Sequence, residues 1–482
     1  MVKLFDECKK GNLNAVIKRT TKININNQNN DGDTMLHIAL NHRHNDIAMY
    51  LLNNGANVHI LNNYCESPLL IACDLGNYYA AKLLISKGAN VNDCYNNGYD
   101  YEYTCLHKAC EKNNVNIVYL LLRNGANVNM KKSSMCSALH VACGNNNVDI
   151  VNGLIDNGAN IYDVDEDNNT PLYTACKCAN TDVVELLLTK MHRNFDRNSC
   201  FSVACRCGHL GVIGHLIKNQ NINEKFSFGE TYIFIACSYG KYDVVNLLIK
   251  NKADVNIKTV HGETPIFAAC CHGYYDIVKL LVENGATVND KNSDDNTCTY
   301  IACKYGYVDI VEYLLKSGAN VNERCDRYEN TMLRIACIRN RYKMVNTLIE
   351  AGADVSIRNR EHYTCIIDAC KYSSGNIVEL LIKKGASVNE RDNIRSCLYY
   401  ACYYEQFDNV VMLMKHDVII DENTNNHRMI KRYLQDHKKE IGKELYKYLM
   451  PKKMYILSLI VQRDVLKYYI IPLMIKYEQN ML

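Results

Sequence analysis

Apolar residues along the chain fall into pairs of short segments, each long enough for two or three turns of helix. In one such pair, Thr264 and Pro265 precede the first segment, as an N-cap and a first-turn proline do at the start of a helix. The second segment, 276–283, is apolar at most positions, which predicts a helix buried over most of its circumference. Gly285 follows where a left-handed residue closes a helix. The pattern predicts a unit of two short helices joined by a loop.

This unit repeats along most of the chain, and the dipeptide Ala-Cys marks each copy. The anchor alanines are Ala72, Ala109, Ala142, Ala175, Ala204, Ala236, Ala269, Ala302, Ala336, Ala369 and Ala401. Eight of the ten steps between them are 32 to 34 residues long, and Ala39 lies 33 residues before the first. A constant period of this length is typical of a stack of small units that pack only on their neighbours.

The units resemble the ankyrin repeat, whose 33 residues form a turn and two antiparallel helices and open with Thr-Pro-Leu-His-x-Ala. Matches to this opening lie at 34–39, 67–69, 104–109, 137–142 and 170–172, and a closing Gly-Ala recurs at Gly55, Gly88, Gly125, Gly158, Gly285, Gly318, Gly352 and Gly385. The resemblance implies an all-α ankyrin-repeat solenoid, a curved and elongated stack of helix-turn-helix units with β-turn fingers. It divides the chain into a degenerate N-terminal capping repeat at 1–30, about twelve repeats at 31–420, and a helical C-terminal cap or F-box-like tail at 421–482.

Four units depart from the closing pattern. Those that end near Lys190, Asn219 and His416 lack the glycine, and Lys252 stands in its place before Ala253. We expect these units to be looser or bent. Two of the distances between successive anchor alanines are irregular. One is 37 residues, which places an insertion at about 95–101 in one finger, and the other is 29 residues, which shortens the connection near 193–199.

The 24 cysteines require a choice between metal binding and packing. Eleven follow the anchor alanines, and five more occupy the proline position of the opening: Cys105, Cys200, Cys298, Cys365 and Cys397. Free cysteine packs as a small hydrophobic residue, whereas structural zinc needs four converging ligands. Because the repeat accounts for most of the cysteines, we expect buried thiols and no metal ion.

Candidate catalytic residues are equally scarce. His37, His107 and His140 share one position of the opening, to which the resemblance assigns a structural hydrogen bond with a neighbouring turn. No Walker loop, Gly-x-Ser-x-Gly elbow or His-Glu-x-x-His helix occurs in the sequence. An enzyme that used a cysteine would need a thiol of lowered pKa near a histidine, and the spacing does not support one. We expect neither an enzyme nor a cofactor.

The composition narrows the class of partner. The chain has 55 Lys and Arg against 52 Asp and Glu, and this near balance argues against a dedicated nucleic-acid or membrane-surface binder. No secretory signal is visible, and the apolar stretch at 454–475 is interrupted by charged residues. We expect a soluble monomer in a reducing cytoplasm, the host cytoplasm if the source is viral.

The resemblance places protein recognition on the concave surface of the stack. The second residue after Ala-Cys belongs to that surface, and in the last six units it includes Tyr239, Tyr305, Tyr372 and Tyr404; Lys304 and Lys371 precede two of these tyrosines. Tyrosine offers large, stiff contact area and is enriched in binding hot spots. The chain has 35 tyrosines, so the row is either a binding site or a result of composition. The function we predict is a non-enzymatic protein-binding scaffold.

The segment after residue 420 loses the period and carries 12 Lys and Arg against 7 Asp and Glu. One interpretation is a helical cap on the last unit, which such stacks require. A second follows from Pro451, Ile456, Leu457, Asp464 and Leu466, which resemble a degenerate F-box of the poxvirus ankyrin family, the PRANC type. That resemblance implies a substrate adapter that recruits Skp1 to a cullin-type ubiquitin ligase by helix-in-groove docking.

Overall fold

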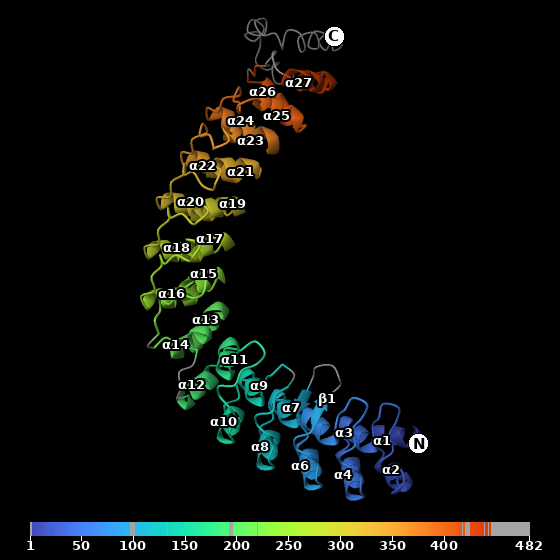
Figure 1. Ribbon diagram of the computed structural model, residues 1–482. Helices are drawn as coiled ribbons and strands as arrows, with labels where there is room; N and C mark the ends of the chain where they lie inside the picture. Colours follow the sequence, from blue (N-terminus) through green and yellow to red (C-terminus); the bar gives the residue numbers. More distant parts are fainter. Residues whose placement is uncertain are drawn as a thin grey trace. The chain divides into compact units, whose positions relative to one another are not determined.

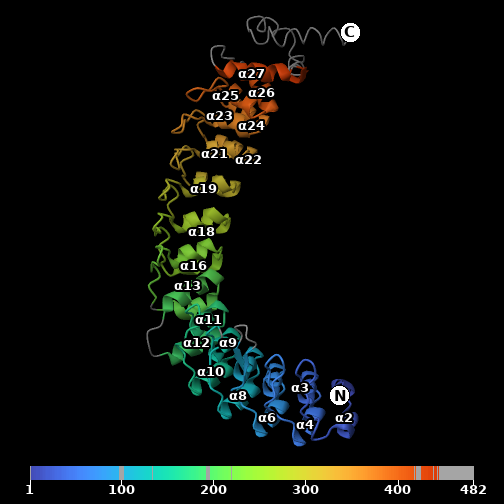
Figure 2. The same ribbon diagram turned by 45° about the vertical axis from the view of Figure 1, so that its right-hand side comes forward.

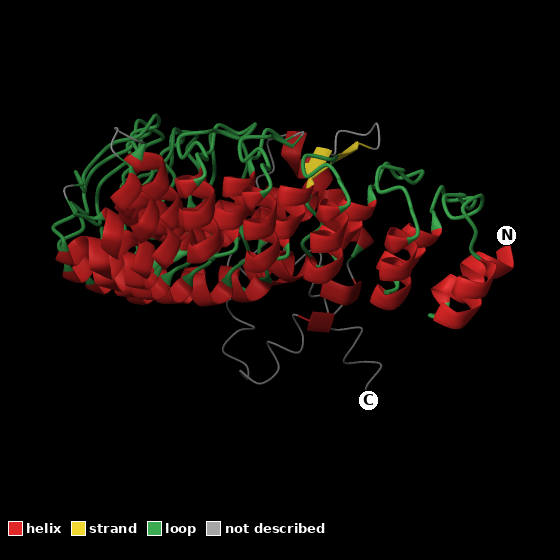
Figure 3. Cartoon of the chain, turned by 90° about the horizontal axis from the view of Figure 1, so that it is seen from below, coloured by secondary structure: helices red, strands yellow, loops and turns green. Residues whose placement is uncertain are grey.

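Helices form the described part of the chain almost throughout. The computed structural model describes residues 2–96, 102–132, 134–191, 196–218, 220–416, 418–419, 425–437, 439–441 and 443–444. The chain divides into two compact units, Met1–Asn221 and Ile222–Leu482. Within each unit the finger loops lie along one edge of the helices (Figure 3).

The first unit is a stack of helix pairs. Its helices are α1 (Val2–Lys9), α2 (Leu13–Arg19), α3 (Met35–Asn41), α4 (Asn45–Asn53), α5 (Pro68–Asp74), α6 (Tyr78–Ser86), α7 (Cys105–Glu111), α8 (Val115–Arg123), α9 (Ala138–Gly144), α10 (Val148–Asp156), α11 (Pro171–Lys177), α12 (Thr181–Lys190), α13 (Arg197–Cys207) and α14 (Leu210–Leu216). Each first helix packs on the first helix of the next pair, and each second helix on the next second helix. Strands β1 (Cys94–Asn96) and β2 (Glu102–Thr104) pair antiparallel in the finger that carries the predicted insertion.

The second unit repeats the same arrangement. Its helices are α15 (Tyr232–Ser238), α16 (Tyr242–Lys250), α17 (Pro265–His272), α18 (Tyr275–Glu283), α19 (Cys298–Tyr305), α20 (Val308–Lys316), α21 (Met332–Ile338), α22 (Tyr342–Glu350), α23 (Cys365–Tyr372), α24 (Gly375–Lys383), α25 (Cys397–Tyr403), α26 (Phe407–Met414) and α27 (Asn425–Asp436). The first helices, α15 to α25, follow one another in a row beside the row of second helices (Figures 1 and 2). Helix α27 packs on α25 and buries Ile430, Tyr433 and Leu434.

Helix ends follow the signals in the sequence. Helix α17 begins at Pro265 after the N-cap Thr264, and α18 covers the predicted 276–283 with one additional residue at its start. Gly285 has φ +86°, the left-handed conformation predicted for the closing residue. The prediction of a repeated helix pair is confirmed.

The anchor residues form the centre of each stack. All eleven alanines of the Ala-Cys pairs and their cysteines are at most 2% exposed, and so are the five cysteines at the proline position. Small side chains at these positions let neighbouring first helices approach closely. Burial raises the pKa of the Cys303 thiol to about 12, so this thiol stays protonated and unreactive at neutral pH. All 24 cysteines are free thiols.

Three histidines join one unit to the next. In each, Nδ1 lies beside the N-cap hydroxyl of its own helix, and Nε2 lies 3.1 Å from a backbone carbonyl oxygen of the following finger. The residues are His37, His107 and His140, and the carbonyls belong to Glu66, Cys136 and Asn169. Burial lowers the pKa of His107 to about 4, so its ring is neutral at neutral pH. The structural hydrogen bond that the resemblance implied for these residues is present.

Asparagine side chains make a second link between units. The side-chain oxygen of Asn289 accepts a hydrogen bond from the backbone N–H of Asn320 at 3.0 Å, while its Nδ2 donates to the carbonyl of Gly318 at 3.0 Å. In the first unit Asn129 makes the same two bonds with the backbone of Asn160 and Gly158. We call this repeated arrangement the asparagine ladder. It satisfies backbone groups of each closing turn that would otherwise lack a partner.

Lys252 adopts the backbone conformation of the glycine that it replaces. Its φ is +65°, and the following Ala253 is buried as in the other units. Asn256 in the same turn still hydrogen-bonds to the backbone of Thr287 and Gly285. The closing turn thus keeps the backbone geometry of the glycine units, with Lys252 in a left-handed conformation that is unfavourable for L-residues.

Among the described helices, none has both the length and the apolar character that crossing a lipid bilayer requires.

Replacing Lys252 with glycine is expected to stabilise the protein. A residue with a side chain loses about 1 kcal/mol in the left-handed conformation, so Lys252→Gly should raise the free energy of unfolding by about that amount. Gly285→Ala is the matched reverse change, since a Cβ at Gly285 would meet no atom within 4 Å. Urea unfolding followed by far-UV circular dichroism should therefore shift in opposite directions for the two variants. Equal midpoints for Lys252→Gly and the native protein would contradict the explanation.

Candidate functional site

A row of exposed side chains lies at the ends of the first helices in the second unit. We call the four residues that follow each Ala-Cys the post-anchor residues. The second of them is exposed in all six consecutive pairs, and we call these six residues the tyrosine row: Tyr239, His272, Tyr305, Arg339, Tyr372 and Tyr404. The four tyrosines are 51%, 51%, 46% and 39% exposed in chain order. Each stands at the last residue of a first helix or directly after it.

Ring contacts hold the C-terminal end of the tyrosine row in place. The rings of Tyr372 and Tyr404, from consecutive units, have centroids 5.6 Å apart, and Tyr403 lies 5.2 Å from Tyr404. Partial burial and the hydroxyl of Tyr404 raise the pKa of Tyr372, so its hydroxyl is neutral at physiological pH. Such rings present apolar faces and hydroxyl groups without needing to be ordered first.

The two predicted lysines have different environments. Lys304 is half-buried beside Tyr305. Lys371 is only 7% exposed, and its ammonium nitrogen lies 3.8 Å from the ring centroid of Tyr363 and 4.0 Å from that of Tyr400. The structure therefore places Lys371 inside the stack, beneath the tyrosine row, and not among the exposed groups where the sequence placed it.

Lys371 belongs to a buried charged cluster that links α21, α23 and α25. Arg334 pairs with Asp368, and Lys371 lies 4.0 Å from the same carboxylate. Burial raises the pKa of Asp368, while the neighbouring Arg334 and Lys371 oppose that shift. Desolvation lowers the pKa of Lys371. The Asp368 carboxylate joins α23 to α21 through Arg334, and the ring of Tyr400 above Lys371 joins α23 to α25.

Sequence reasoning missed this cluster. Arg334 occupies the position that His37 holds in the first unit, and Asp368 follows the equivalent position one unit later. Opposite charges at these two internal positions were the available signal, since internal positions of a stack are otherwise apolar or histidine. The aromatic partners Tyr363 and Tyr400 carried no such signal, because tyrosine is frequent throughout the chain.

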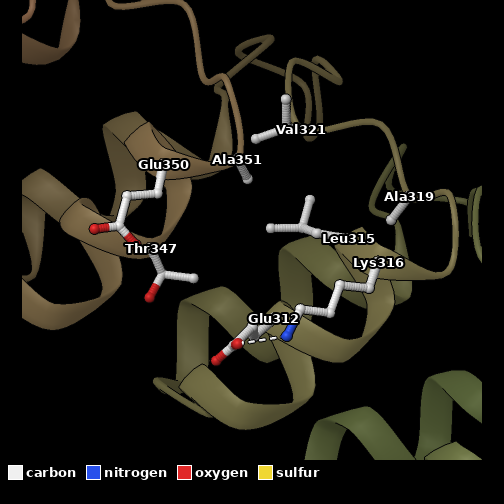
Figure 4. Close-up of a pocket in the computed structure, with 8 residues that line it drawn as sticks. All are labelled: Glu312, Leu315, Lys316, Ala319, Val321, Thr347, Glu350 and Ala351. Atoms are coloured by element: carbon white, nitrogen blue, oxygen red, sulfur yellow. Dashed lines mark hydrogen bonds and ion pairs between the residues drawn. The ribbon is translucent and has the colours of Figure 1, made fainter.

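A groove lies on the side of the second helices, between α20 and α22 (Figure 4). Its volume is about 400 Å³, and its lining residues are Glu312, Leu315, Lys316, Ala319, Val321, Thr347, Glu350 and Ala351. The charged groups in it are already paired, with Lys316 2.7 Å from Glu312 and Asn346 donating to Glu350. A smaller groove occurs at the corresponding place beside α16 and α18, so such grooves follow from helix stacking.

In the described ranges, no group of three or more His, Cys, Asp or Glu residues is arranged so that it could hold a metal ion. The tail residues Pro451, Ile456, Leu457, Asp464 and Leu466 lie outside the described residues.

Comparison with known proteins gives the same family along most of the chain. The family model for ankyrin repeats, described as three copies, matches residues 4–95, 92–165, 160–226, 201–292, 288–359 and 352–426. These ranges include the first helices α3 to α25 in full, and α1 from its third residue.

Individual relatives match over shorter stretches. A putative ankyrin repeat protein of fowlpox virus is 34% identical over 129 residues, 27% of this chain and 17% of the relative. A putative ankyrin repeat protein of Acanthamoeba polyphaga mimivirus is 34% identical over 106 residues, 19% of this chain and 30% of the relative. The chain thus spans less than a third of the length of either viral relative. The crystal structure of the human ASB11 ankyrin repeat domain is 25% identical, with a TM-score of 0.39, over 48% of this chain and 96% of that one.

The charged cluster yields a test of stability. Asp368→Leu leaves Arg334 and Lys371 buried without their carboxylate and should lower the free energy of unfolding by about 3–5 kcal/mol. The double variant Arg334→Met/Asp368→Leu leaves only Lys371 buried without a carboxylate, so it should be more stable than Asp368→Leu alone. Urea unfolding by far-UV circular dichroism measures both. The single variant Arg334→Met completes the comparison. If the loss of unfolding free energy in the double variant equals the sum of the losses in the two single variants, the three groups do not act together.

Proposed function

This chain belongs to the ankyrin-repeat family, and on that basis we propose that it is a non-enzymatic scaffold that binds a partner protein along the tyrosine row. Ankyrin repeats are protein–protein interaction modules, and the regular helix pairs of the second unit provide the support for such a surface. In this proposal the tyrosine row of the second unit contacts the partner protein.

The distribution of tyrosine carries the proposal. The post-anchor residues of the second unit include seven tyrosines: Tyr239, Tyr274, Tyr305, Tyr307, Tyr372, Tyr403 and Tyr404. The post-anchor residues of the first unit, counted from Ala39-Leu40, include none. Each set holds six copies of four positions, and abundance alone would place about two tyrosines in each, since 35 occur among 482 residues. Composition therefore does not account for the row.

Binding at this row requires little reorganisation. The tyrosines stand on helix ends that pack directly on neighbouring helices, and each side chain has few rotatable bonds. Preorganised contacts of this kind reduce the entropy lost on association, so a few aromatic anchors supply most of the affinity. The buried cluster below Tyr372 contributes by fixing α21, α23 and α25.

A non-enzymatic role also fits the chemistry of the described residues. Burial raises the pKa of the Cys303 thiol, and burial lowers the pKa of His37, His107 and His140 although their backbone hydrogen bonds oppose that shift. Free thiols in such number suit a reducing compartment, so we place the protein in the cytoplasm.

A second candidate function is a substrate adapter of a cullin-type ubiquitin ligase, with the tail as the recruiting element. The F-box-like residues of the tail and the similarity to a fowlpox ankyrin repeat protein support it. In this alternative the tyrosine row selects the substrate, and apolar residues near Ile456 and Leu466 dock on Skp1.

Loss of the four tyrosines should abolish partner binding. Tyr239→Ala/Tyr305→Ala/Tyr372→Ala/Tyr404→Ala removes the anchors but should leave the thermal unfolding midpoint nearly unchanged, because exposed positions contribute little to stability. Affinity capture with the intact protein, followed by mass spectrometry, measures the partners retained.

The control is Tyr242→Ala/Tyr342→Ala, which changes tyrosines 42% and 50% exposed on second helices of the same unit. This variant should retain the partners. Unfolding of the four-tyrosine variant would mean that the row belongs to the core.

Recruitment of Skp1 tests the alternative function. The full chain should retain purified Skp1 in a pull-down, and Ile456→Asp/Leu466→Asp should abolish retention, because a charge in an apolar helix–groove contact is strongly unfavourable. The four-tyrosine variant serves as control and should still bind Skp1. Absence of Skp1 from the full-chain pull-down would exclude the adapter role and leave the scaffold proposal intact.

A further inference from the structure

Cations outnumber carboxylates among the post-anchor residues of the second unit. In the second unit these positions hold five cations, Lys241, Lys304, Arg339, Arg341 and Lys371, together with His272. They hold a single carboxylate, that of Glu405 in the last pair. The tyrosine row therefore has cationic neighbours along most of its length.

Two of these cations serve the stack itself. Arg341 donates from Nη1 to the carbonyl oxygens of Cys303 and Lys304 at 2.8 and 2.9 Å, which closes the end of α19. Lys371 is buried between the two tyrosine rings already described. The other three differ, since Lys241, Lys304 and Arg339 have no carboxylate partner within 4 Å among the described residues.

The same positions in the first unit hold two carboxylates and no tyrosine. Its post-anchor residues include Asp74 and Glu111, and Lys112 lies 3.6 Å from the carboxylate of Asp74. Lys108 lies 3.3 Å from the same carboxylate. The first unit also has the cations Arg43, Lys177 and Arg206 at post-anchor positions but no tyrosine there, so cations beside exposed tyrosines at these positions distinguish the second unit.

We infer that the tyrosine row receives an extended, acidic segment of the partner protein. This inference rests on the proposed function and adds the chemistry of the ligand. Carboxylates of the segment pair with Lys304 and Arg339, and its apolar groups pack on the faces of Tyr305 and Tyr372. Tyrosine hydroxyls supply further hydrogen-bond donors to carboxylates. Complementary charge directs the encounter and selects the partner, while the rings hold it.

Two other occupants fit the charges less well. Residues 445–482 of the chain carry six Lys and Arg against two Asp and Glu, so they would repel the cations of the row. Single-stranded nucleic acid places a phosphate at every nucleotide and needs a continuous basic track. Among the described residues, the row offers only Lys241, Lys304 and Arg339 as cations that do not serve the stack itself, and residues such as Tyr305 stand between them, so it has no such track.

The test is a selection of displayed random twelve-residue peptides on the intact protein. Peptides that bind the native protein but not the four-tyrosine variant are expected to carry net negative charge. Selection on Lys304→Glu/Arg339→Glu should favour peptides of net positive charge. Lys250→Glu/Lys343→Glu makes the same charge change on second helices and should select the same peptides as the native protein.

Binding measurements complete the test. Fluorescence anisotropy measures the affinity of the best acidic peptide for the protein. This affinity should be at least tenfold lower for Lys304→Glu/Arg339→Glu than for the native protein, and the native protein should show the same loss when the salt concentration is raised. Row-dependent peptides of neutral or positive charge would overturn the inference and leave the proposed function standing. If no peptide distinguishes the native protein from the four-tyrosine variant, the proposed function itself fails. Row-dependent binding of a twenty-nucleotide oligo-dT, without selection of acidic peptides, would also overturn the inference.

Discussion

The structure depends on one constraint: a pair of short helices cannot bury its own apolar surface and must pack on a neighbouring pair. The anchor alanines and cysteines meet this need because their small side chains allow first helices to approach closely. Burial alone would tolerate sliding between neighbours. Directional hydrogen bonds from the internal histidines and from the asparagine ladder fix the position of each unit on the next.

The same constraint separates positions that serve the fold from positions available for recognition. Residues in helix interiors, closing turns and finger bases pack on or hydrogen-bond to neighbouring units, whereas the ends of the first helices remain open to solvent. At these ends the second unit has seven tyrosines and a single carboxylate, whereas the first unit has asparagines, two carboxylates and no tyrosine. The difference is informative because the supporting backbone is the same in both units.

Much of this organisation can be read from sequence, since helix starts, closing turns and the period depend on local signals. Thr264, Pro265 and Gly285 act where their chemistry predicts. Side chains whose roles depend on neighbouring units are harder to predict. Lys304 and Lys371 occupy the same position of the repeat, but Lys371 is buried because Tyr363 and Tyr400 of its own and the next unit enclose it. The left-handed conformation of Lys252 likewise lies outside the ordinary preference of a lysine.

The asparagine ladder has a consequence for how such a chain changes length. Each rung joins an amide side chain in one closing turn to backbone groups in the next, and the turn at 285–289 offers both halves of the bond, since it receives Asn256 and supplies Asn289. A duplicated unit would therefore find compatible neighbours on both sides without compensating substitutions. Gene segments that encode one unit can be added or lost in whole numbers, and new combinations of surface residues arise on an unchanged frame.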